Sequence, residues 1–183
     1  MNTLVKGSIA DIAMSGKKSI AETFVGADCV VIVDTSGSMG TNDSAGGKSR
    51  YEVACQELAA LQASMPGKIA VLSFSDRVMF CPDGKPFNFG VNTNLTKALK
   101  FAKIADIPPI QFIVISDGQP DDPRGALAIA RTYKNRIDVI YVGPESHPVG
   151  RDFLEQLARA SGGVTVTADR VAELSTTIQK LLA

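Results

Sequence analysis

Short oxygen-bearing side chains follow a buried apolar run near the amino-terminal end of the chain. Asp34, Ser36 and Ser38 stand at alternate positions directly after the apolar run at residues 29–33. Aspartate and serine carry hard oxygen ligands, which can come within the roughly 2.0 to 2.6 Å at which Mg²⁺ or Ca²⁺ is held, and neither residue suits a soft transition metal. The spacing therefore predicts a divalent-metal site and a metal-dependent binding protein.

The composition is that of a globular protein with a single core. The chain has 183 residues, of which 45% are hydrophobic, and 19 basic residues balance 19 acidic ones. Zero net charge without a block of like charges excludes the electrostatic footprint of nucleic-acid binding. We see neither a signal peptide nor a membrane-spanning segment, and three cysteines without C-x-x-C spacing fit a reducing compartment. We therefore expect a cytoplasmic protein without nucleic-acid or membrane partners.

Short apolar runs alternate with helical patterns after residue 28. We expect strands at 29–33, 68–74, 78–80, 110–116, 137–142 and 164–167, and helices at 50–64, 95–105, 125–133, 152–160 and 171–182. Strands that are apolar throughout are covered on both faces, and the alternation is typical of a mostly parallel sheet. The connection between residues 74 and 78 is too short for a parallel crossover, so those strands form a hairpin. The prediction is a doubly wound α/β fold with a six-stranded sheet, one antiparallel edge strand and helices on both faces.

The candidate ligands follow the carboxyl ends of two strands. Open parallel sheets bind ligands outside these ends, near the point where the strand order reverses. Asp34, Ser36 and Ser38 follow the strand at 29–33, and Asp117 follows the strand at 110–116. We expect the two strand ends to converge on one site.

The first 27 residues stand apart as an N-terminal helical arm, ahead of the domain at 28–183. Ser8 with Asp11, and Ser19 with Glu22, both match the S-x-x-[DE] form of a helix capping box. Two short helices are therefore expected. Their apolar residues favour docking onto their own domain over use as a partner-binding arm.

Three motifs, taken together, resemble the von Willebrand factor A (vWA) family. They are Asp34-Thr35-Ser36-Gly37-Ser38-Met39, Asn92-Thr93-Asn94-Leu95 and Ile115-Ser116-Asp117-Gly118, in that order. The resemblance runs from about residue 27 to the C-terminus and implies a Rossmann-like vWA fold with an intact metal-ion-dependent adhesion site (MIDAS). By this likeness Ser36, Ser38 and Thr93 are hydroxyl ligands, while Asp34 and Asp117 bind the ion directly or through water.

The resemblance also implies a function. An Asp or Glu of a protein partner would displace water from the metal and complete its shell. The low carboxylate count favours Mg²⁺, with Mn²⁺ or Ca²⁺ as alternatives. Intracellular bacterial members of the family work beside AAA-type ATPases or in stress-response assemblies, so we expect a non-enzymatic interaction module of that kind. The expected partner-binding rim is Met39, Gly40, Asn92, Asn94, Gly118 and Asp121.

Other interpretations of these residues remain open. Asp34 is placed like the nucleophile of a small Mg²⁺-dependent phosphohydrolase, although no second aspartate stands two residues later. A metal-bound structural scaffold subunit is a third alternative. Thr93 could simply cap the next helix and Asp117 could belong to a turn. We expect Asp43 to be a solvated loop residue.

Overall fold

The sheet of the computed structural model contains six strands in the order β3-β2-β1-β4-β5-β6. The structure describes residues 4–43, 47–87, 90–118, 120–144 and 148–167. The strands are β1 (Cys29–Asp34), β2 (Ile69–Phe74), β3 (Val78–Phe80), β4 (Gln111–Ser116), β5 (Ile137–Tyr141) and β6 (Thr165–Thr167). All neighbouring pairs are parallel except β2 and β3, which are antiparallel. The predicted doubly wound sheet with one antiparallel edge strand is confirmed.

The helices fall close to the expected positions. They are α1 (Ile9–Ser15), α2 (Ile20–Val25), α3 (Arg50–Ser64), α4 (Leu95–Ala102), α5 (Pro123–Ala130) and α6 (Pro148–Ser161), with 3-10 turns η1 (Gly37–Gly40) and η3 (Lys103–Ala105). Helices α5 and α6 begin earlier than predicted, each at a proline, because the fixed φ of proline suits the first helical position. The helix expected at 171–182 lies outside the described residues. No helix in the described part of the chain is long and apolar enough to cross a membrane.

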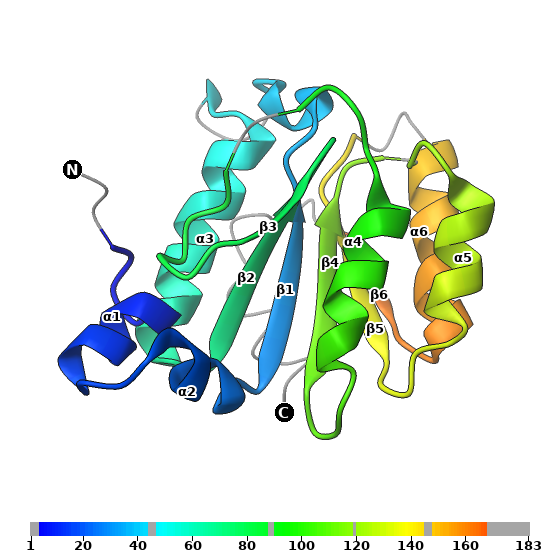
Figure 1. Ribbon diagram of the computed structural model, residues 1–183. Coiled ribbons are helices and arrows are strands. Elements are labelled where there is room, and N and C mark those ends of the chain that lie inside the picture. The colour runs from blue at the N-terminus through cyan, green and yellow to red at the C-terminus, as the bar shows by residue number, and fades with distance from the viewer. Residues whose placement is uncertain (1–3, 44–46, 88–89, 119, 145–147, 168–183) are drawn as a thin grey trace.

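The sheet separates two apolar layers. Alternate residues of β1 point to opposite faces, so Val30 and Ile32 pack with helices α4, α5 and α6, whereas Val31 and Val33 pack with α3. Figure 1 shows α4 lying across the sheet, with α5 and α6 beside it and α3 near β2. All six residues of β1 are buried, as expected for a central parallel strand.

Two short N-terminal helices pack against this domain. Ser8 caps α1 by accepting a hydrogen bond from the backbone of Asp11, and Ser19 forms a complete capping box with Glu22 at the start of α2. Ala10 of α1 donates a backbone hydrogen bond to Pro82, and the Phe24 ring of α2 lies edge-on to that of Phe80, 5.4 Å away. The helices predicted from the two capping signals are confirmed.

Candidate functional site

Asp34 is the last residue of the central strand, and its carboxylate is buried between two hydroxyl-bearing segments. Its Oδ1 accepts a hydrogen bond from the Ser36 backbone at 2.8 Å, and its Oδ2 accepts one from the Ser116 hydroxyl at 2.6 Å. The side chain is fully buried. Burial raises the pKa of Asp34 from 3.8 to about 6, although the hydrogen bonds from Ser116 and Ser36 oppose this shift. Asp34 is therefore a buried carboxylate that a nearby cation would stabilise.

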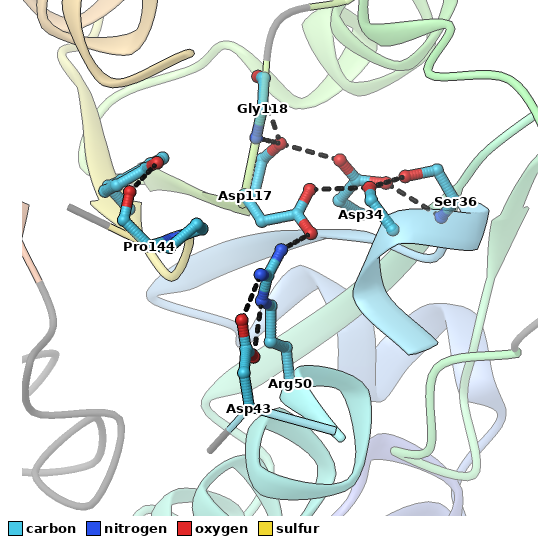
Figure 2. Close-up of polar contacts among 10 residues, drawn as sticks. Asp34, Ser36, Asp43, Arg50, Asp117, Gly118 and Pro144 are labelled. Carbon is cyan, nitrogen blue, oxygen red and sulfur yellow. Dashed lines mark hydrogen bonds and ion pairs between the residues drawn. The ribbon is translucent and has the colours of Figure 1, made fainter. Parts of the chain in front are cut away.

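Ser36, Ser38 and Asp117 form a continuous row of oxygen atoms beside Asp34. The hydroxyls of Ser36 and Ser38 lie 3.3 Å apart, and Ser38 donates to Oδ1 of Asp117 at 2.8 Å. Figure 2 shows Asp34, Ser36 and Asp117 close together, although Asp117 follows strand β4 and the other two lie at the end of β1. The structure thus brings together four of the five predicted ligands through direct contacts.

The turn that carries the serines is anchored to β2. Thr35 donates from both its backbone and its hydroxyl to the carbonyl of Phe74, at 2.8 and 2.9 Å. The chain then turns through η1, which exposes Ser38 but directs Met39 inward. Our expectation that Met39 lies on the partner-binding rim is wrong, because its side chain is fully buried in the α3 layer.

A separate loop holds Thr93 at the same end of the sheet, where the strands reach their carboxyl ends. Ser75, directly after β2, donates to the carbonyl of Asn92 at 2.8 Å and accepts from the backbone of Asn94 at 3.2 Å. The backbone of Thr93 makes two hydrogen bonds with Asp121: its N–H donates to the side-chain Oδ1 at 3.2 Å, and its carbonyl accepts from the Asp121 backbone at 3.1 Å. The loop therefore links the end of β2 to the segment after β4.

The cap of α4 is not Thr93. Asn94 occupies that position, and its side chain accepts from the Lys97 backbone at 3.1 Å. The alternative of Thr93 as a simple helix cap is therefore wrong, whereas Asn94 of the expected rim has a structural role. Asn92 is exposed and donates its side-chain amide to Asp76.

The two rim glycines border open space. A Cβ atom added at Gly40 or Gly118 would meet no other heavy atom within 4 Å. Asp121 is also exposed, next to Asp122, which caps α5 through the Gly125 backbone at 2.9 Å. Apart from Met39, the rim residues are at least partly exposed at the carboxyl ends of the strands.

Arg50 is a residue of the site that sequence reasoning missed. Its Nη1 donates to Oδ2 of Asp117 at 2.6 Å, and its Nε donates to Oδ1 of Asp43 at 2.9 Å, while Nη2 pairs with the other oxygen of Asp43. Figure 2 shows the guanidinium lying between the two carboxylates. Asp43, which we expected to be solvated, is thus an ion-pair partner. One sequence signal was available, since Arg50 is the first residue of a helix, where the macrodipole disfavours a cation.

The oxygen spacings fit a small divalent ion. Neighbouring ligands of an octahedral Mg²⁺ with bonds of about 2.1 Å lie about 3.0 Å apart. The contacts from Ser36 to Ser38 and from Ser38 to Asp117, at 3.3 and 2.8 Å, bracket that value. In the described part of the chain no group of three His, Cys, Asp or Glu side chains is placed to hold a metal. A metal here would depend on serine and threonine hydroxyls together with the two aspartates.

This architecture is an open, mostly parallel sheet with an oxygen-rich cluster where its central strands end. Solved structures with the same fold include "von Willebrand factor type A" from Catenulispora acidiphila, at 17% identity and a TM-score of 0.65 over 85% of this chain and 41% of that one. The ArnB paralog VWA2 from Sulfolobus acidocaldarius matches at 23% identity and a TM-score of 0.66, over 86% of this chain and 44% of that chain. The fold is therefore that of vWA domains.

A third structure agrees over nearly its whole length. It is an aerotolerance-related membrane protein from Bacteroides fragilis NCTC 9343 with multiple mutations to serines, at 16% identity and a TM-score of 0.65. The match covers 86% of this chain and 98% of that chain. Neither the models of known families nor the curated proteins give a match to this sequence. The likeness therefore lies in the fold.

Proposed function

We propose that this chain is a divalent-metal-dependent protein-interaction module of the vWA type. Asp34, Ser36, Ser38, Thr93 and Asp117 would hold the ion, for which Mg²⁺ is the first candidate and Mn²⁺ and Ca²⁺ are alternatives. The observation that carries the proposal is the row of oxygen atoms joining Ser36, Ser38 and Asp117 at ligand-like spacing beside the buried Asp34.

The chemistry of the donor set supports a binding role. Neutral hydroxyls contribute no charge, so a divalent ion held mainly by them remains strongly attractive to an incoming carboxylate. The exposure of Ser38, Gly40 and Gly118 would let an Asp or Glu of a partner approach this edge of the sheet. The bound ion would supply Lewis acidity, while the residues around it would orient the acidic side chain.

We further propose that the module is not an enzyme. A phosphoryl-accepting aspartate must be open to an incoming phosphate, whereas the side chain of Asp34 is fully buried. Among the residues that the structure describes, no histidine or lysine takes part in the contacts that hold the site together. Asp34 is thus better suited to tuning the site than to attacking a substrate.

The proposed setting is a cytoplasmic bacterial assembly, such as one with an AAA-type ATPase or a stress-response complex. Partner capture tests the function directly. The purified chain would be immobilised and incubated with native lysate in Mg²⁺ or in chelator, and retained proteins identified by mass spectrometry. Asp34→Ala combined with Ser38→Ala removes the site, and Asp152→Ala, on the exposed face of α6, is the matched control.

We expect a partner that is retained in Mg²⁺ by the wild type and by the control, and lost in chelator and with the double variant. Substituting the acidic residues of that partner one at a time should identify the carboxylate that reaches the metal. Retention that is the same in all arms would refute metal-bridged binding.

A further inference from the structure

An arginine at the first position of a helix is unusual unless something compensates it. The amino end of a helix carries a partial positive charge, which disfavours a cation by some tenths of a kcal/mol. Arg50 occupies this position in α3, and its side chain is only 8% exposed. Its placement must therefore be stabilised by its contacts.

Those contacts are made with one residue of the candidate metal site and one residue outside it. The inner partner, Asp117, has a side chain that is 1% exposed and lies 2.6 Å from Nη1. The outer partner, Asp43, is 40% exposed and takes the other side of the same guanidinium. Asp43 makes two contacts with the guanidinium and Asp117 makes one, but the contact with Asp117 is buried and therefore less screened by solvent.

The remaining contacts of Asp117 make the arrangement specific. While Oδ2 binds Arg50, Oδ1 accepts from Ser38, a proposed metal ligand. Asp117 therefore faces the metal site with one oxygen and the arginine with the other. A cation at the site and the guanidinium would share one carboxylate.

We propose that Arg50 is a built-in countercharge that weakens metal binding by itself and leaves the loaded site positively charged for an acidic partner. The three buried groups Asp34, Asp117 and Arg50 together carry a formal charge of −1, so a divalent ion brings them to +1. Asp43 adds a further negative charge on the far side of the guanidinium, but its side chain is 40% exposed and solvent screens it. Without Arg50 the two carboxylates would neutralise the ion completely. This inference rests on the proposed metal-dependent function and assigns Arg50 the role of coupling metal to partner.

Two substitutions are expected to move metal affinity in opposite directions. Arg50→Met removes the repulsion between the guanidinium and the ion, so Mg²⁺ should bind about tenfold more tightly, which is the size expected for such charges a few ångströms apart. Asp43→Asn removes the outer partner and leaves the full charge of Arg50 directed at the site, so Mg²⁺ should bind a few-fold more weakly. If Arg50 served only to hold Asp43 and Asp117 in place, both substitutions would weaken Mg²⁺ binding.

The experiment is calorimetric titration of Mg²⁺ into the metal-free wild type, both variants and Arg159→Met, an exposed control on α6. Thermal melts with and without Mg²⁺ give a second measure, because Arg50→Met leaves the buried Asp117 without a charged partner and should gain more stability from the metal. If Arg50→Met does not fold, Asp43→Asn still decides the result, because the side chain of Asp43 is 40% exposed. Tighter binding by Asp43→Asn, or weaker binding by Arg50→Met, would overturn the role of Arg50.

A carboxylate probe tests the second half of the inference. Acetate should tighten Mg²⁺ binding by the wild type more than by Arg50→Met, because only the wild-type site is left with a positive charge. Equal effects of acetate on the two proteins would contradict the coupling. Failure of the wild type to bind Mg²⁺ at all would instead refute the proposed function, and this inference with it.

Discussion

The buried carboxylate of Asp34 should make the metal-free protein less stable as pH rises. Its pKa is about 6 in the folded protein and 3.8 when unperturbed, so the folded state retains a proton that the unfolded state has released between these values. Stability from this group is fully present below pH 3.8 and is lost as pH rises through 6. Since each pH unit corresponds to about 1.4 kcal/mol, the loss should be about 3 kcal/mol.

Asp34→Asn isolates this effect, because asparagine has a similar shape but does not titrate. Urea unfolding in chelator at pH 4 and pH 7.5 would give the free energy of unfolding of both proteins. The stability of the variant relative to the wild type should rise by about 2.4 kcal/mol between the two pH values, because a small part of the loss has already occurred at pH 4. A difference that does not change with pH would refute the reasoning that Asp34 is strongly desolvated.

Metal should reverse this pH dependence in the wild type. Bound Mg²⁺ would stabilise the ionised carboxylate, so its affinity should increase as pH rises through 6, whereas Asp34→Asn should show little metal-induced stabilisation at either pH. Proton release during the Mg²⁺ titration, measured in buffers of different ionisation enthalpy, provides an independent check.

Three other changes test the surrounding structure. Leu58→Ala removes a fully buried side chain of α3 and should cost about 2–5 kcal/mol in urea unfolding, whereas a cost below about 1 kcal/mol would contradict tight packing there. Gly90→Ala would place a Cβ only 1.3 Å from the Ser75 hydroxyl, so it should displace the loop that carries Thr93 and weaken Mg²⁺ binding, with little change in far-UV circular dichroism. Tyr133→Phe removes a buried hydroxyl that donates to the Leu99 carbonyl at 2.6 Å, and a loss of about 1–2 kcal/mol is expected; unchanged stability would show that the bond adds nothing.

The parts of the fold that depend on local pattern could be predicted from the sequence. Continuous apolar runs identified the interior strands, the short 75–77 connection identified the hairpin, and Ser19 with Glu22 identified α2 through its capping box. The start of α3 at Arg50 was also predicted. In each case residues near in sequence determine the structure, so periodicity and turn length were sufficient.

The errors concern side chains whose environment is set by distant parts of the chain. Met39 follows an exposed serine, yet the 3-10 turn η1 directs it under α3, and nothing in the local sequence specifies that rotation. The Arg50–Asp117 pair joins residues 67 positions apart, so no spacing rule could reveal it. The convergence of the two strand ends could be predicted, because it follows from the topology of parallel sheets.

The short edge strand β3 limits how an extended peptide could add to this sheet. One edge of the sheet is formed by β3, a strand of three residues, while β2, β1, β4 and β5 have five or six. An extended peptide that adds to a sheet needs a longer row of free backbone groups, and short edges are one way in which proteins prevent aggregation through strand pairing. Binding by addition of a peptide strand is therefore disfavoured at the β3 edge. The loops at the strand ends, which can change in sequence without disturbing the sheet, are the surface on which evolution can vary specificity.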